Sequence, residues 1–240
     1  MCFSVQVEKN QLKLAKRFKA EVSAAEDKAF RELKARGDDL DYVKQALWLA
    51  RRPSTNPFKE PGDDGRVFPG YFTWVIVHEK GRRVFKKMRY RVRPHGAPEI
   101  PSKFNVFNAR IDAIEKRKTW KGLFMRNHAL VPFVRFYEWV EHDGKKKLIT
   151  FAPENKDIMW APGLWDHWES KDGKISFSSF AIITDDPPPE VAEMGHDRCP
   201  IFLQESAIDE WLTPAKKSKA DMYEILKTKE EVTYKNMWAA

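Results

Sequence analysis

The stretch LVPFVRFYEWVEHDGKKKLITF, residues 130–151, decides the fold class of this chain. Residues 130–140 are rich in β-branched and aromatic side chains, which favour strands. The turn that follows contains Asp143-Gly144, a pair that tolerates the positive φ angles of a tight hairpin. Residues 148–151 then return to an apolar β pattern. The stretch therefore predicts an antiparallel hairpin.

Further strands are expected on both sides of this hairpin. Residues 71–78 and 83–91 predict a second hairpin, and residues 159–165 and 175–184 predict two more strands. At the N-terminus, Phe3, Val5 and Val7 alternate with polar residues, which predicts a half-buried strand over 2–7 that holds the N-terminus inside the fold. Residues 105–110 are expected to be irregular. Residues 185–193 contain three consecutive prolines and are expected to form an extended loop.

Helical patterns dominate the N-terminal part of the chain. Apolar residues recur every three or four positions over 11–36, Gly37 is expected to end this helix, and Asp38-Asp39 begins another that reaches residue 49. Shorter helices are expected at 111–120, after Ser206 as N-cap, and at 220–227. Helices followed by a run of strands predict an α+β fold, compact and β-rich, with a mostly antiparallel sheet and peripheral helices. One domain over residues 1–240 is expected, with 10–50 as a helical elaboration.

Composition narrows the class of protein. Cys2 and Cys199 are the two cysteines, which excludes a disulfide framework and fits a reducing compartment. Neither a Cys-x-x-Cys nor a His-x-x-x-His pair occurs, so no metal or other cofactor is expected. Without an apolar run of 18 residues or a secretory signal, the sequence predicts a cytoplasmic protein that does not cross a membrane. The net charge of +8 indicates a partner that carries phosphates.

The pair Met1-Cys2 offers distinct chemistry. Removal of Met1 would leave a cysteine whose α-amine titrates near about 8 and whose thiol titrates near about 8.5. The amine can condense with an aldehyde to an imine, and the thiol can close on that imine to form a thiazolidine ring. The same residue can serve as an N-terminal nucleophile that uses its own amine as base. Alternatively, position 2 tolerates a small residue and the cysteine is inert.

Three other stretches contain candidate catalytic groups. Asn108-Ala109-Arg110 places a carboxamide and a guanidinium outside regular structure. Glu138 lies among aromatic residues in an apolar strand, where burial would raise its pKa toward the range useful for acid–base catalysis. His196 lies between a long loop and a core strand. Structural roles are open for each: Asn108 in a turn, Glu138 in an ion pair, and His196 on a backbone carbonyl.

Residues 86–93 alternate cations with apolar residues at the period of a strand. One face of this strand would be basic and the other buried. The basic face is expected to be either a solvated sheet surface or a phosphate-binding surface.

The order of these motifs resembles the SOS response-associated peptidase (SRAP) family. The resemblance covers the first few residues and about residues 66–212. It rests on Cys2, Asn108-Ala109-Arg110, Phe136-Tyr137-Glu138-Trp139, Gly163-Leu164-Trp165 and His196-Asp197-Arg198-Cys199-Pro200, with further similarity at 66–70 and 90–94.

The resemblance implies a barrel-like fold and a protein that shields abasic sites in single-stranded DNA through a thiazolidine crosslink. Cys2 would be the crosslinking nucleophile, and the family is thought to expose it by cleaving its own N-terminus. Asn108 would hold Cys2 and the sugar, Glu138 would shuttle protons, and His196 would assist ring opening and release. The implied DNA-binding residues are Arg110, Lys118, Pro69, Tyr90 and Arg198.

The chain departs from the family pattern beside the nucleophile. The family usually continues Cys-Gly-Arg, whereas this chain has Cys2-Phe3-Ser4, and Tyr90 and Arg91 replace an expected tryptophan and glycine. Cys199 is expected to be an inert core thiol.

The sequence therefore predicts a monomeric DNA-damage protein that is linked covalently to abasic sites in single-stranded DNA. Two alternatives are a thiol peptidase that acts on other chains through Cys2 and His196, and a non-covalent single-stranded DNA-binding protein that lost the chemistry with the Gly-Arg pair.

Overall fold

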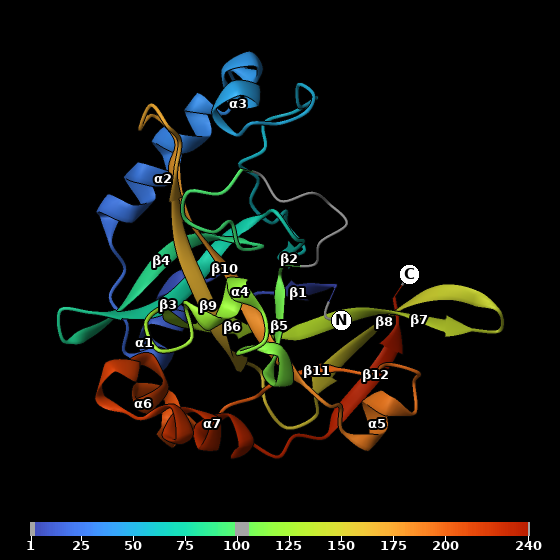
Figure 1. Cartoon of the computed structure of the whole chain (residues 1–240). Coiled ribbons are helices and arrows are strands. Elements are labelled where there is room, and N and C mark those ends of the chain that lie inside the picture. Colours follow the sequence, from blue (N-terminus) through green and yellow to red (C-terminus); the bar gives the residue numbers. More distant parts are fainter. Residues whose placement is uncertain (1–2, 99–105, 240) are drawn as a thin grey trace.

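The computed structural model describes residues 3–98 and 106–239. Three helices follow the first strand, and runs of strands with short helices between them make up most of the remaining chain, as Figure 1 shows in sequence colours. The helices are α1 (Gln11–Phe18), α2 (Ala24–Arg36), α3 (Leu40–Ala46), α4 (Lys118–Lys121), α5 (Pro189–Ala192), α6 (Ile208–Leu212) and α7 (Lys219–Lys227). The strands are β1 (Ser4–Gln6), β2 (Arg66–Val67), β3 (Phe72–Glu79), β4 (Arg82–Tyr90), β5 (Asn108–Arg110), β6 (His128–Phe133), β7 (Arg135–His142), β8 (Lys145–Pro153), β9 (Met159–Glu169), β10 (Ser176–Asp185), β11 (Cys199–Pro200) and β12 (Tyr234–Trp238).

Five strands close into a barrel. The order is β10-β4-β3-β6-β9, and β9 pairs again with β10. Pairing is antiparallel except between β10 and β4, which run parallel. The short strands β5 and β11 also pair with β10. Closure removes the unpaired edges that an open sheet of this size would expose.

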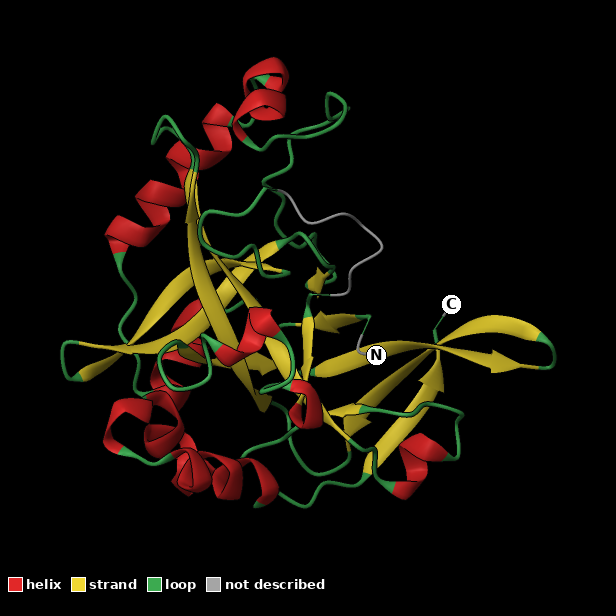
Figure 2. Ribbon diagram, in the orientation of Figure 1, coloured by secondary structure: helices red, strands yellow, loops and turns green. Residues whose placement is uncertain are grey.

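A second, antiparallel sheet has the order β12-β8-β7-β1-β2. The long β7–β8 hairpin extends away from the barrel (Figure 2). Its turn has φ of 55° at Asp143 and 68° at Gly144, as the Asp-Gly pair predicts. Strand β1 lies between β7 and β2, so the N-terminal strand is held inside the sheet as expected. These features confirm the predicted α+β class with mostly antiparallel pairing.

The run at 130–140 is two strands and not one. Strand β6 belongs to the barrel and β7 to the second sheet, and the chain changes sheets at Val134. The Val134 N–H donates to the carbonyl of Gln6 at 2.7 Å, which ties this crossing to the end of β1. The run contains no glycine, and its second strand follows the first with a single residue between them.

The predicted helix at 11–36 is also divided. Glu21 forms an isolated bridge with Val84 of β4, since its N–H donates to the Arg83 carbonyl and its carbonyl accepts from the Phe85 N–H. The chain leaves the helical path at Lys19, where φ is 49°. Helices α2 and α3 then pack at one end of the barrel on a smaller apolar cluster that includes Phe30, Phe72 and Trp168.

Several shorter predictions are also corrected. Residues 108–110 are strand β5 and not irregular, and 111–120 holds a 3₁₀ turn and the short α4. The loop at 185–193 contains α5, because the third proline occupies the first helical position, where its missing N–H costs nothing. Ser206 lies inside a 3₁₀ turn and caps no helix. Strand β12 was not predicted, and it pairs with β8.

The basic face predicted for β4 and the residues after it is mostly covered. The Lys87 side chain is 8% exposed, pairs with Glu60 and lies 5.0 Å from the Phe30 ring centroid on α2. Arg93 is fully buried, with its guanidinium carbon 3.4 Å from the Trp168 ring centroid. Lys87 and Arg93 therefore contact carboxylate and aromatic side chains and are not part of an open basic surface. In the described ranges 3–98 and 106–239, no helix is long and apolar enough to cross a membrane.

Candidate functional site

Glu138 and His196 form a buried pair. Glu138 is 1% exposed on β7, and His196 is 8% exposed in the loop between α5 and β11. The Nε2 atom of His196 lies 3.0 Å from Oε2 of Glu138. The structure therefore brings together two predicted catalytic residues that are 58 positions apart in the sequence.

Alternation along β7 explains why a carboxyl group lies inside the protein. Phe136, Glu138 and Val140 are buried, whereas Tyr137 is half-buried and Trp139 is 46% exposed. Side chains of a strand alternate between its two faces, so Glu138 occupies the middle position of an otherwise apolar row. Phe136 stacks on Phe151 of β8 with ring centroids 5.1 Å apart, which fixes this row against its neighbour.

The surroundings affect the protonation of Glu138 and the tautomer of His196. Burial raises the pKa of Glu138, and the hydrogen bond to His196 opposes that rise. Nδ1 of His196 lies 2.8 Å from the Arg198 carbonyl oxygen and 3.3 Å from the Arg198 backbone nitrogen, and the shorter contact assigns a hydrogen to Nδ1. A neutral ring then presents its lone pair at Nε2 to Glu138. One proton shared between Glu138 and Nε2 therefore suits proton transfer to and from a bound substrate.

Asn108 and Tyr90 form a second pair. Asn108 begins β5, is 8% exposed and lies opposite Ile182 of β10. The Tyr90 hydroxyl donates to Oδ1 of Asn108 at 3.1 Å and so orients its carboxamide. Tyr90 is fully buried and stacks on Phe180 with centroids 5.2 Å apart. The structure thus corrects the expected role of Tyr90, which supports Asn108 from inside the protein and presents no surface to DNA.

The N-terminal strand, β1, begins beside Glu138. The Phe3 N–H donates to the carbonyl of Tyr137 at 3.0 Å, and Ser4 pairs with Tyr137 in the β1–β7 ladder. Cys2 lies outside the described residues, so its role stays a prediction. Phe3, which follows Cys2 in the sequence, lies next to the backbone that precedes Glu138.

Cys199 is a buried thiol near the same pair. It is 5% exposed on β11, and burial raises its pKa to about 12. A hydrogen bond with Tyr234 opposes this rise in pKa, and the Glu138 carboxylate contributes to it. The thiolate is the nucleophilic form of cysteine. Cys199 is therefore protonated and unreactive at neutral pH, as expected for a core thiol.

The other predicted DNA contacts occupy different surroundings. Arg110 lies 2.7 Å from Asp112 and 3.6 Å from Asp186, so its guanidinium faces two carboxylates. Lys118 is exposed at the start of α4, and Pro69 is half-buried in the turn after β2. The carbonyl oxygen of Arg198 accepts a hydrogen bond from His196. The guanidinium group of Arg198 lies 3.6 Å from the Asp197 carboxylate.

The sequence analysis did not predict several residues that lie next to the candidate site. The Arg66 guanidinium carbon lies 4.0 Å from the Tyr137 ring centroid, and its Nε donates to the Ser4 hydroxyl at 2.9 Å. Phe3 packs edge-on against Phe68 and Trp139, with centroids 6.0 and 6.1 Å apart. The sequence held two signals: Arg66 begins the motif at 66–70, and Tyr137 and Trp139 take the outward positions of β7.

Comparisons with known proteins agree on one family. The family model described as SOS response associated peptidase (SRAP) matches residues 1–238. The chain is 24% identical over 149 residues to the abasic site processing protein YoqW of Bacillus subtilis, covering 62% of this chain and 66% of YoqW. It is 26% identical over 213 residues to the abasic site processing protein HMCES of Pongo abelii, covering 76% of this chain and 59% of HMCES. The matches thus span just under two thirds of these relatives.

Solved structures share the fold. A crystal structure of a protein from Bordetella bronchiseptica superposes with a TM-score of 0.69 at 19% identity and covers all of both chains. A protein from Bacteroides thetaiotaomicron gives a TM-score of 0.68 at 17% identity, covering 100% of this chain and 92% of that one.

Proposed function

Because the chain belongs to the SOS response associated peptidase (SRAP) family, we propose that it processes abasic sites in single-stranded DNA and is linked to them covalently through Cys2. The observation that carries this proposal is the buried Glu138–His196 pair next to the start of β1. The peptide bond between Cys2 and Phe3 keeps their Cα atoms about 3.8 Å apart. The reactive amine and thiol would therefore act close to an acid–base pair.

The crosslink forms in three steps. The Cys2 α-amine, freed by removal of Met1, adds to the aldehyde carbon of the ring-opened deoxyribose, forming a C–N bond and a carbinolamine. Protonation of its hydroxyl lets water leave, and an imine results. The Cys2 sulfur then bonds to the imine carbon while its proton passes to the nitrogen, which closes a thiazolidine ring. The balance is one ring formed and one water released.

Glu138 and His196 supply the proton transfers in this scheme. Because burial raises its pKa, Glu138 retains a proton more readily than an exposed carboxyl group and can donate it to the leaving hydroxyl. His196 can accept a hydrogen bond from the protonated Glu138 through Nε2, held in place by the hydrogen bond from Nδ1 to Arg198. Glu138 can regain its proton from the iminium nitrogen that remains after water leaves. Asn108, oriented by Tyr90, would hold the sugar by hydrogen bonds.

Aromatic side chains beside β1 suit a single-stranded partner. Trp139 is 46% exposed and contacts Phe3 edge-on. Bases stack on such rings with about 1–3 kcal/mol each, and an aldehyde in a single strand is not shielded by base stacking. Phe3, which replaces the glycine usual in the family, would add apolar surface to this contact.

A denaturing gel tests the proposal. Incubation with an abasic-site oligonucleotide should give a band of reduced mobility that survives denaturation and is absent for Cys2→Ala. Cys199→Ala is the matched control and should crosslink normally, because its buried thiol stays protonated. Intact mass should show loss of Met1 in the active preparation.

Two other outcomes would contradict the proposal. Salt-sensitive binding to the oligonucleotide without any denaturant-stable band would favour a non-covalent single-stranded DNA-binding protein. Cleavage of unrelated peptides that is blocked by thiol alkylation and unaffected by DNA would favour a thiol peptidase that acts on other chains.

A further inference from the structure

A cavity of about 620 Å³ opens between helix α1 and the residues around the start of β9. Lys13, Lys16 and Arg17 of α1 line one side of it, and Lys156 and Trp160 line the other. None of these residues belongs to the candidate site. The cavity is therefore a separate feature, formed in part by the helical segment that elaborates the N-terminal region.

Packing of α1 places its cations around this opening. Leu14 and Phe18 are 3% and 1% exposed, and the Phe18 ring contacts Trp160 edge-on with centroids 5.6 Å apart. Residues three and four positions apart share a helix face, so Lys13, Lys16 and Arg17 lie together beside this buried stripe. The apolar anchor thus fixes the orientation of the basic residues.

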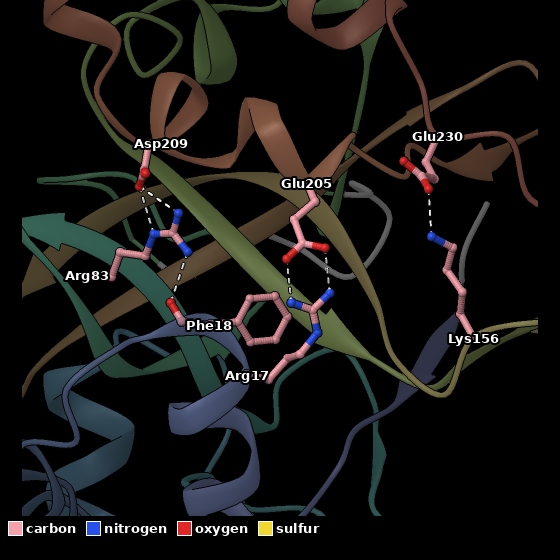
Figure 3. Close-up of polar contacts among 7 residues, drawn as sticks. All are labelled: Arg17, Phe18, Arg83, Lys156, Glu205, Asp209 and Glu230. Carbon is pink, nitrogen blue, oxygen red and sulfur yellow. Dashed lines mark hydrogen bonds and ion pairs between the residues drawn. The ribbon is translucent and has the colours of Figure 1, made fainter.

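Two cations are held in position by carboxylates outside the cavity lining. Figure 3 shows both Arg17 guanidinium nitrogens directed at Glu205, at 2.5 and 2.8 Å, and Lys156 paired with Glu230 at 2.6 Å. The same groups lie near the Trp160 ring, with centroid distances of 5.0 Å for Arg17 and 6.0 Å for Lys156. Arg17 and Lys156 are therefore oriented before any ligand binds.

The cavity lining favours an anion that accepts hydrogen bonds. The lining holds four cations and one carboxylate, Asp157. Three of these cations already pair with a carboxylate, Arg17 and Lys156 as described above and Lys13 with Glu8, whereas Lys16 makes no ion pair within the described ranges. Each lysine ammonium has three N–H donors, so a single ion pair leaves donors for a ligand. Trp160 is 2% exposed and its indole Nε1 is buried, so the ring contributes an apolar wall and no donor.

We propose that this cavity binds a phosphate group, supplied by a nucleotide or by the backbone of single-stranded DNA. A phosphate accepts several charge-assisted hydrogen bonds at once, which matches the lysine donors of α1 and Lys156. The volume is within the range of about 300–1,000 Å³ that is typical of small-ligand sites. A strand bound here would have a contact separate from the crosslinking site.

The test compares two charge reversals on exposed helix positions. Lys16→Glu changes the cavity, and Lys28→Glu on α2 makes the same charge change elsewhere. Binding of deoxyadenosine monophosphate and of an undamaged single-stranded oligonucleotide is measured by calorimetry at two salt concentrations. We expect Lys16→Glu to weaken binding of at least one ligand by about tenfold relative to Lys28→Glu, with a salt slope lower by about 1 if a DNA phosphate is the ligand.

The results distinguish a nucleotide phosphate from a DNA backbone phosphate, and either of them from no phosphate binding. An effect on the mononucleotide identifies a nucleotide site, and an effect on the oligonucleotide alone identifies a DNA backbone contact. Equal affinities of Lys16→Glu and Lys28→Glu for both ligands would overturn the proposal. Crosslinking of a short abasic oligonucleotide should be the same in both variants, so a failure here is distinct from a failure of the Cys2 chemistry.

Discussion

At the scale of single residues, Glu138 links stability to chemistry. Its pKa is raised by burial above the usual 4.5, so in the window above pH 4.5 the folded protein holds a proton that the unfolded chain has released. Stability contributed by this group is present below that pH and is lost as the pH rises through the raised pKa. The Glu138 carboxyl group, which the proposed mechanism uses as an acid, therefore lowers the free energy of unfolding as the pH rises above 4.5.

Glu138→Gln should separate these two effects. The amide cannot ionise, so the unfolding free energy of the variant should increase relative to that of wild type as the pH rises from about 5 to about 8. Its crosslinking rate should fall by about 10²–10⁴-fold, the usual contribution of a general acid–base group. Urea titrations at both pH values and timed denaturing gels measure the two quantities. Parallel stability curves for variant and wild type would show that burial does not perturb this carboxyl.

His128 predicts a second pH dependence of opposite direction. It is 3% exposed, stacks on Trp211 with centroids 3.8 Å apart, and burial lowers its pKa from 6.5 to about 4. As the pH falls from 6.5 through 4, the unfolded chain takes up a proton that the folded protein excludes. About 3 kcal/mol of stability should be lost in this window.

His128→Phe provides the comparison for this loss. The ring can still stack on Trp211, but nothing titrates at position 128, and the Trp211 carbonyl loses its hydrogen bond from Nδ1. The variant should be less stable at neutral pH yet lose less stability on acidification. Chemical denaturation at about pH 7 and about pH 4.5 measures both. If the variant loses as much stability on acidification as wild type does, titratable groups other than His128 cause the loss.

At the scale of elements, Gly37 ends helix α2 for a reason of space. Its φ is −66°, an ordinary helical value, so no left-handed conformation requires glycine. A Cβ at this position would lie 2.2 Å from Oδ1 of Asn56 and 2.6 Å from the Phe58 ring. Gly37→Ala should therefore destabilise the protein by about 1–3 kcal/mol through overpacking. Gly62→Ala is the control, since its nearest atom beyond its chain neighbours is 3.8 Å away, and should be nearly neutral. Urea denaturation of both variants measures the difference.

Sequence patterns correctly predicted the elements whose formation depends on neighbouring residues. The Asp143-Gly144 turn and the β3–β4 hairpin needed only neighbouring residues, and the sequence located both. The break at Glu21 depends on its bridge to Val84, 63 positions away, so the helical spacing across it was misleading. Strand β5 likewise exists because Asn108 pairs with a distant strand, β10. The Glu138–His196 pair was predicted as two candidates, but nothing in their spacing indicated that they touch.

At the scale of the whole molecule, the site and the α2–α3 region rest on separate parts of the core. Phe136, two residues before Glu138, belongs to the main cluster that fills the barrel and the second sheet. Phe30 belongs to the smaller cluster under α2 and α3, which includes none of the predicted catalytic residues. Regions with fewer buried apolar contacts open at lower free energy than the main core.

Phe30→Ala should therefore loosen one region and leave the chemistry intact. Phe30 is 5% exposed and its ring centroid lies 4.9 Å from that of Phe72, so its truncation should cost about 3–5 kcal/mol. Hydrogen exchange should quicken in α2 and α3, while crosslinking measured below the unfolding transition should match wild type. Phe136→Ala, a deletion of equal size beside Glu138, should instead slow crosslinking. If Phe30→Ala slows it as much as Phe136→Ala, the two clusters act as one cooperative unit, and the helical region supports the reactive site directly.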